Sequence, residues 1–216
     1  MNKSLLTSRG FFSLEGIDGS GKTTQMDLLE KALIKQGYEC LRIREPGGSK
    51  ISENIRELLL NVEFQDKMAI QTELLLYNAA RAQVIDELIK PALLANKLVL
   101  ADRFAWSTYA YQAFGRQLDP SLILELSSLT CGEYFPDYTV ILDLPVSESR
   151  DRMLLENKKP DRLEAESDLF FERVREGYLD IAKRFPQHAK VLAANQSVEA
   201  LHQQILSSVL SRLKGD

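Results

Sequence analysis

The chain has 216 residues, of which 27 are Lys or Arg and 31 are Asp or Glu, so its net charge at pH 7 is −4. This length suits one domain with a substantial core and leaves little room for a second, so we predict a single domain over residues 1–216. The acidic balance and the lack of a dense basic tract argue against a nucleic-acid partner.

Hydropathy and cysteine content argue against a membrane or secreted protein. No apolar run approaches membrane-spanning length, and Ser8, Arg9 and Gly10 interrupt the N-terminal leucines too early for a signal-peptide core. The two cysteines, Cys40 and Cys131, lie far apart with no paired His or Cys nearby. We therefore expect buried, reduced thiols, no membrane partner and a cytoplasmic protein.

The first predicted element is a short apolar strand over residues 10–15, and a glycine-rich octapeptide follows it, Gly16-Ile17-Asp18-Gly19-Ser20-Gly21-Lys22-Thr23. This run fits G-x-x-x-x-G-K-[ST], a loop whose main-chain N–H groups surround the phosphates of a nucleoside triphosphate. Lys22 adds a positive charge, and Thr23 offers a hydroxyl to Mg²⁺. A helix predicted from there to Gly37 directs its N-terminal dipole at the same anion.

Four further apolar runs predict strands at residues 40–43, 98–101, 138–142 and 190–193. A turn signal and a helical pattern follow each of them; the longest pattern covers residues 68–95, and the last begins near Ser197. Strands that are apolar on both faces and alternate with helices imply a parallel sheet. The sequence thus predicts an α/β protein with the three-layer P-loop NTPase fold, a five-stranded parallel sheet with helices on both faces. Ligands of such a sheet bind at the carboxyl ends of its strands.

Polar motifs follow two of these strands. Residues 44–48 form an Arg-Glu-Pro-Gly-Gly turn whose glycines allow close approach of a ligand, and Arg56 on the next helix either reaches back to an anion or is solvated. Asp102 is placed to hold Mg²⁺ through water or to orient Arg103, whose planar fork suits a phosphate. A purely structural Asp-Arg pair is the alternative.

Tyr77 and Arg81 lie four residues apart in the long helical pattern and therefore share a face of that helix. Such a pair can stack on a base and hydrogen-bond its edge. Periodicity alone is equally compatible with a core tyrosine beside a salt-bridged arginine.

Three segments in the right order resemble the thymidylate kinases, and the resemblance runs over nearly the whole chain. They are Glu-Gly-x-Asp-Gly-x-Gly-Lys-Thr-Thr at residues 15–24, Arg-Glu-Pro-Gly-Gly at 44–48, and Asp102-Arg103 followed by Ser107-Thr108 and Tyr111-Gln112. The resemblance implies transfer of a phosphoryl group from ATP to dTMP in DNA precursor synthesis, with Mg²⁺ as cofactor. It also implies a homodimer.

The resemblance further assigns site residues. The ATP site comprises Gly16, Asp18, Gly19, Ser20, Gly21, Lys22, Thr23, Thr24 and Arg152, the last beside the adenine. The dTMP site comprises Asp18, Glu45, Pro46, Arg56, Tyr77, Arg81, Arg103, Ser107, Thr108, Tyr111 and Gln112. Within it, the tyrosine at 77 stacks on thymine, the arginine at 81 donates to O4, those at 56 and 103 hold the acceptor phosphate, and the tyrosine at 111 packs against the deoxyribose. Thr23 and Asp102 are the metal residues.

A mobile lid is expected at about residues 153–166. One branch of the family carries an arginine inside the phosphate loop, whereas this chain has Gly19 and Ser20 there, so the lid should supply positive charge. This lid is poor in arginine. The residues expected to act in catalysis are Lys22, Asp18, Arg103, Lys158, Lys159 and Arg162.

Three other functions remain open at the level of sequence. A kinase for another nucleoside monophosphate, or for a deoxynucleoside, would use the same scaffold. A GTP-dependent switch protein needs an Asn/Thr-Lys-x-Asp motif, and residues 157–161, Asn-Lys-Lys-Pro-Asp, miss that spacing by one residue. A regulatory nucleotide-binding module without turnover would not need the acceptor-site residues.

Overall fold

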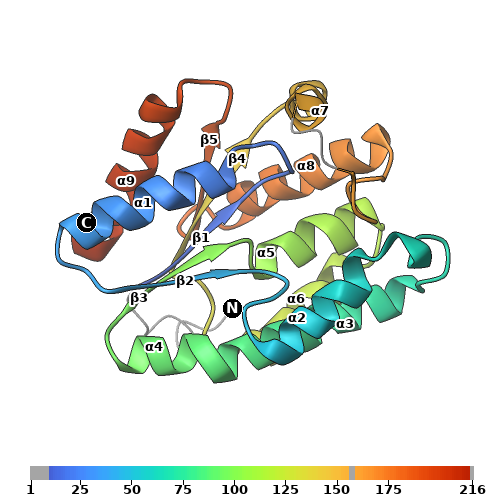
Figure 1. The fold of residues 1–216 in the computed structure, drawn as a ribbon, viewed down its shortest axis with the longest axis horizontal. Helices are drawn as coiled ribbons and strands as arrows, with labels where there is room; N and C mark the ends of the chain where they lie inside the picture. The colour runs from blue at the N-terminus through green and yellow to red at the C-terminus, as the bar shows by residue number, and fades with distance from the viewer. Residues whose placement is uncertain (1–9, 156–158, 215–216) are drawn as a thin grey trace.

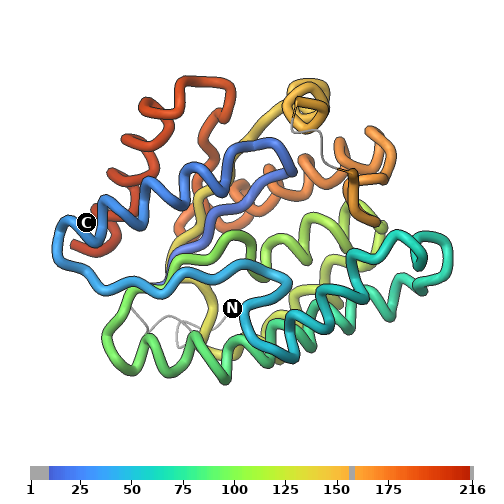
Figure 2. The backbone as a smooth tube through the Cα atoms, in the orientation of Figure 1, coloured from blue at the N-terminus to red at the C-terminus, as the bar shows by residue number. Residues whose placement is uncertain are grey.

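A five-stranded parallel sheet forms the centre of the computed structural model, which describes residues 10–155 and 159–214 (Figures 1 and 2). Its strand order is β2-β3-β1-β4-β5, and all four neighbouring pairs are parallel. The strands are β1 Phe11–Glu15, β2 Cys40–Arg44, β3 Leu98–Asp102, β4 Tyr138–Asp143 and β5 Ala189–Ala193. The predicted fold is confirmed, and each strand lies within one residue of its expected bounds.

Helices connect the strands, as the apolar periodicity predicts. They are α1 Lys22–Lys35, α2 Lys50–Leu60, α3 Ile70–Val84, α4 Lys90–Leu94, α5 Ala105–Thr108, α6 Pro120–Cys131, α7 Val146–Leu155, α8 Asp168–Arg184 and α9 Val198–Lys214. A short 3₁₀ turn, η2, covers Val62–Phe64, and two π-helical segments, η3 and η4, cover Ile85–Ile89 and Tyr109–Gly115. The helical pattern predicted over residues 68–95 is therefore α3, η3 and α4 in succession.

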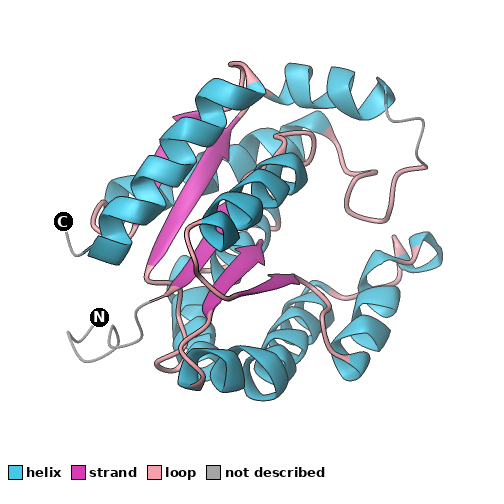
Figure 3. Cartoon of the chain, turned by 60° about the vertical axis from the view of Figure 1, so that its left-hand side comes forward, coloured by secondary structure: helices cyan, strands magenta, loops and turns pink. Residues whose placement is uncertain are grey.

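Both faces of the sheet are covered, which explains why its strands are apolar on both sides. One face carries α1 and α9, whose Leu29 and Ile205 lie in one core cluster with Leu14 of β1 (Figure 3). The helices from α3 to α6 and α8 lie on the other face, where Phe11 packs with Val84 of α3. Adjacent residues of β1 thus point into opposite halves of the core.

Helix α8 packs closely on η4. A Cβ placed on Gly177 would lie 2.9 Å from the Cα of Ala110, so only glycine allows this approach of the two backbones. The neighbouring Tyr178 is 2% exposed and lies under the carboxyl end of the sheet. Helix α8 is in this way held against η4, which follows β3 and α5 in the chain.

The cysteines partly differ from expectation. Cys131 is buried, as predicted, but Cys40 is only partly buried because it starts β2 at the edge of the sheet. Neither forms a disulfide. None of the helices in the described ranges combines the length and apolar character needed to cross a membrane.

Candidate functional site

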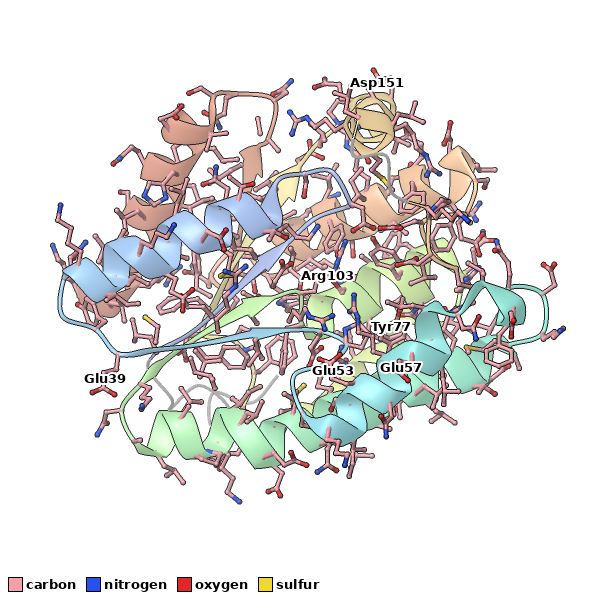
Figure 4. The ribbon with its side chains drawn as sticks, viewed as in Figure 1. Glu39, Glu53, Glu57, Tyr77, Arg103 and Asp151 are labelled. Atoms are coloured by element: carbon pink, nitrogen blue, oxygen red, sulfur yellow. The ribbon has the colours of Figure 1, made fainter. Side chains whose placement is uncertain are left out.

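A cleft of about 580 Å³ opens at the carboxyl ends of the strands, where the parallel topology predicts a ligand site. The structure brings most of the expected site residues to its lining: Asp18, Gly19, Ser20, Gly21, Lys22, Thr23, Thr24, Glu45, Pro46, Arg56, Tyr77, Arg81, Asp102, Arg103, Ser107, Thr108, Tyr111, Gln112 and Arg152. Figure 4 shows Arg103 near the centre of the molecule, with Tyr77 on the side of α3.

The phosphate loop has the backbone that its glycines predict. Gly16, Gly19 and Gly21 have φ values of +140°, +73° and +87°, a region that other residues rarely adopt. A Cβ at Gly16 would lie 2.5 Å from the carbonyl oxygen of Leu142, so the close approach to β4 requires glycine there as well. Helix α1 begins at Lys22, within the phosphate-loop octapeptide, and its first residues, Lys22, Thr23 and Thr24, line the cleft, so the N-terminus of the helix lies at the cleft.

Lys22 lies inside the loop rather than in solvent. Its Nζ donates to the carbonyl oxygens of Gly16 at 3.1 Å and Ile17 at 2.9 Å. Burial, reinforced by the positive charge of Arg103, lowers the pKa of Lys22 to about 8. This ammonium group is therefore held where an anion would restore the charge balance.

Thr23 and Asp102 meet at the rim of the cleft. The Thr23 hydroxyl donates to Asp102 Oδ2 at 3.2 Å, which joins the phosphate loop to the end of β3. A hydroxyl and a carboxylate oxygen side by side are hard oxygen ligands of the kind that Mg²⁺ prefers. These two residues fit the predicted metal position.

Arg103 joins the loops that follow β1 and β3. Its Nη1 donates to the Gly16 carbonyl at 2.7 Å, and its Nη2 to Asp18 Oδ1 at 2.6 Å. Burial disfavours ionisation of Asp18, but the charges of Arg103 and Lys22 outweigh it and lower the pKa of this carboxyl group to about 2. Asp18 is therefore ionised at neutral pH, and it also accepts a hydrogen bond from Tyr111 Oη at 3.4 Å.

A second end of the cleft contains Arg81, which is 1% exposed. Its Nε donates to Glu45 Oε2 at 2.9 Å, and its Nη2 donates to Thr108 Oγ1 at 2.8 Å. Its Nη1 is buried without a hydrogen-bond partner in the described part of the chain. Burial raises the pKa of Glu45 to about 7, although Arg81 opposes this shift. The arrangement leaves one buried donor for an acceptor on a ligand.

Two more expected residues, Arg56 and Arg152, line the cleft and donate to its backbone. Arg56 Nη1 donates to the Pro46 carbonyl at 2.8 Å, which places this arginine beside the turn after β2. Arg152 donates to the carbonyl oxygens of Gly19 at 3.2 Å and Ala194 at 3.1 Å. Both arginines are thereby held at the edge of the cleft.

The expected role of Arg162 is not matched by its position. This residue is 1% exposed, its guanidinium lies 2.7 Å from Glu73 Oε2, and its Nε donates to the Leu59 carbonyl. Glu73 also accepts hydrogen bonds from Arg116 and from Gln112 Nε2, so three side chains contact this carboxylate in the interior. Arg162 joins the segment between α7 and α8 to α2 and α3, and it is not among the residues that line the cleft.

Lys159 and Lys158 are the lysines expected in the lid. Lys159 is exposed and is not among the residues that line the cleft. Lys158 lies outside the described residues. Gly16 does not line the cleft but supplies its carbonyl oxygen to Lys22 and Arg103.

Sequence reasoning overlooked buried polar residues behind the cleft. Glu15, at the end of β1, is 0% exposed and accepts hydrogen bonds from the Phe104 N–H, Ser107 and Tyr178. Burial raises its pKa, and these donors oppose the shift. The signal in the sequence is a carboxylate at the end of an otherwise apolar strand. Ser107 turns its hydroxyl to this carboxylate.

Comparisons with known proteins agree with this geometry. The family model described as thymidylate kinase matches residues 14–205. The chain is 46% identical to a thymidylate kinase of Kosmotoga olearia, covering 94% of this chain and 97% of the relative, and 43% identical to one of Exiguobacterium sibiricum, covering 94% and 95%. A crystal structure of thymidylate kinase from Ehrlichia chaffeensis matches with a TM-score of 0.74 at 34% identity, covering 93% of this chain and 98% of that one.

The lowered pKa of Lys22 predicts how affinity for MgATP depends on pH. Because only the protonated form neutralises phosphate charge, affinity should fall about tenfold between pH 7 and pH 9. Titration calorimetry across this range measures the effect. Lys22→Arg stays charged throughout and should remove the dependence, whatever its absolute affinity. Wild-type affinity that is constant up to pH 9 would contradict the prediction.

Proposed function

The chain belongs to the thymidylate kinase family, and from this we propose that it transfers the γ-phosphoryl group of ATP to dTMP, giving dTDP and ADP. The observation that carries the proposal is the combination of groups that line one cleft. A phosphate loop lies in it together with a buried arginine, Arg81, whose Nη1 has no hydrogen-bond partner among the described residues. The first binds a triphosphate, and the second fits a carbonyl-bearing base.

Arg81 and Gln112 account for the choice of base. We infer that Arg81 Nη1 donates to thymine O4, because Glu45 and Thr108 already engage its other nitrogens. Gln112 donates a hydrogen bond from its Nε2 to Glu73. Its carbonyl oxygen, on the other side of the amide, is therefore suited to accept from the N3–H of a thymine. Cytosine would present an amino donor to Arg81, and a buried charged donor left unpaired costs about 1–3 kcal/mol or more.

The sugar has to be recognised as well as the base. The methyl group that distinguishes thymine from uracil is worth only about 0.8 kcal/mol by area, roughly fourfold in affinity. Discrimination against UMP therefore needs Tyr111, which we place against the deoxyribose where a 2′-hydroxyl would lie. Asp18, to which Tyr111 donates, belongs near the 3′-hydroxyl. Tyr77, half-buried on the α3 side of the cleft, is the candidate to stack on the base.

Phosphoryl transfer here needs alignment and positive charge rather than a general base, because the acceptor oxygen of dTMP is already anionic. We assign Lys22 to the phosphates of ATP, and Arg103 and Arg56 to the phosphate of dTMP. Mg²⁺, when bound beside Thr23 and Asp102, neutralises phosphate charge. The ion pair of Arg103 Nη2 with Asp18 Oδ1 fixes this guanidinium beside the phosphate loop, where we place the phosphate of dTMP.

The lid, residues 153–166, is proposed to close over ATP and exclude water from the transfer step. Arg162 is anchored to Glu73, so the charge brought by closure falls to Lys159 and Lys158. A lysine acts on the phosphates as a point charge, without the planar fork of arginine. Arg162 holds the end of the segment that moves.

We also propose a homodimer and a cytoplasmic location. Helices α2 and α6 both pack on α3, and the three helices carry exposed apolar side chains, among them Leu58 at 47%, Leu75 at 58% and Leu129 at 81% exposure. A second copy would cover such side chains. Light scattering should give twice the mass of the 24.5 kDa chain, and Leu129→Glu should shift it toward the monomer. A monomeric wild type at micromolar concentration would contradict the dimer.

An acceptor panel tests the reaction. ADP release from MgATP should be strong with dTMP and weak with dUMP, UMP, dCMP, dGMP, AMP and thymidine, each offered singly. Lys22→Ala should abolish it, and Lys158→Ala/Lys159→Ala should lower turnover. Preference for another acceptor would overturn the base assignments, and tight guanine-nucleotide binding without turnover would favour a switch protein.

Thr108 offers a test of base recognition at the level of one atom. Thr108→Val is nearly isosteric but removes the oxygen that accepts from Arg81 Nη2, which costs about 1–3 kcal/mol. We expect kcat/KM for dTMP to fall roughly tenfold or more and Thr108→Ser to restore it. Equal kcat/KM for the valine variant and the wild type would show that this hydrogen bond does not orient Arg81.

A further inference from the structure

Arg103 has a backbone conformation that its surroundings must hold in place. Its φ of +69° is in the left-handed region, which residues with a Cβ rarely adopt because the Cβ comes too close to the following carbonyl oxygen. The strain lies at the turn between β3 and α5, where the chain enters the cleft. Contacts from other parts of the fold must therefore stabilise this backbone conformation and orient the Arg103 side chain.

Glu15 supplies the first part of that support. Its carboxylate accepts from the Phe104 N–H at 2.7 Å and from Ser107 Oγ at 2.6 Å, so it pins the residue after Arg103 and the first turn of α5. Glu15 belongs to β1, the central strand, and the phosphate loop starts at the next residue. The carboxylate thus ties the turn that carries Arg103 to the start of the phosphate loop.

Tyr178 supplies the second part, and it comes from a different element, α8. Its hydroxyl accepts from Arg103 Nη1 at 3.1 Å, donates to Glu15 Oε2 at 3.1 Å, and lies 2.9 Å from Ser107 Oγ. Burial keeps the pKa of Tyr178 well above 10, so the hydroxyl remains protonated and can perform both roles. Among the described residues, the Tyr178 side chain joins α8 directly to Arg103.

The placement of Tyr178 is rigid. Gly177 brings the backbone of α8 against Ala110, and the Tyr178 ring packs edge-to-face on Tyr111 with centroids 6.4 Å apart. A hydroxyl on such a support restricts rotation of the guanidinium to which it is bonded. Arg103 Nη1 then stays on Gly16 and Tyr178, and Nη2 stays on Asp18.

We propose that Tyr178, backed by the Glu15 carboxylate, is a positioning residue that holds Arg103 in the orientation needed to bind the phosphate of the acceptor nucleotide. This inference rests on the proposed function, in which Arg103 binds that phosphate. Tyr178 itself touches neither substrate in this account. It acts through Arg103. Helix α8, which follows the proposed lid in the chain, thereby contributes to the acceptor site.

The test is Tyr178→Phe, which keeps the ring and deletes the hydroxyl. Calorimetry should show dTMP binding weakened roughly tenfold and thymidine binding unchanged, because thymidine lacks the phosphate that Arg103 holds. The matched control is Tyr109→Phe. Tyr109 also joins η4 to α8, through hydrogen bonds with Asp180 and Arg184, but it does not contact Arg103, so its loss should leave both affinities unchanged.

A double variant separates positioning from general packing. On an Arg103→Ala background, Tyr178→Phe should have no further effect on dTMP affinity, because its route to the phosphate is gone. Equal weakening of dTMP and thymidine by Tyr178→Phe, or no weakening of either, would overturn the inference while the wild type still phosphorylates dTMP. A wild type that binds dTMP no more tightly than thymidine would instead overturn the assignment of Arg103, and with it both proposals.

Discussion

The cleft depends on the contact of Arg103 with Gly16 and Asp18, which ties together the loops that follow β1 and β3. Strand order makes this contact possible, because β1 and β3 are neighbours and their carboxyl ends meet at one edge of the sheet. The arginine fork spans a carbonyl oxygen and a carboxylate at 2.7 Å and 2.6 Å. A lysine could not hold both in a fixed plane. The backbone strain at Arg103 is the cost of this geometry.

Burial of charge gives the cleft its chemical character. Lys22 is held as a destabilised cation, Asp18 as a stabilised anion, and Arg81 as a cation with one donor unmatched. Protein groups only partly satisfy the two cations Lys22 and Arg81, so we propose that anionic phosphates and a carbonyl-bearing base supply the remaining partners. In the proposed reaction, substrate recognition is largely the neutralisation of positive charges that folding has already desolvated.

Two interpretations from the sequence show where such reasoning reaches its limit. From its position in the sequence, Arg162 is expected to act in catalysis as a positive charge of the lid. Only the structure shows that Glu73, from α3, binds it in the interior. For Tyr77 and Arg81, helical spacing left a structural and a binding role equally open. Glu45 and Thr108, distant in sequence, accept hydrogen bonds from two nitrogens of Arg81. The third nitrogen, Nη1, is buried without a partner among the described residues. In both cases the deciding partner comes from another element.

The sequence by itself determined the fold class, the strand positions and the phosphate loop, because these follow from local periodicity and from backbone conformations that only glycine adopts readily. It also indicated which polar residues gather at the ends of the strands, since parallel topology brings those ends together. Only the tertiary structure decided which of these side chains pair with one another. Glu15, Tyr178 and Arg103 meet across 88 and 75 residues of chain, and no local pattern encodes a contact that depends on how closely α8 packs on η4.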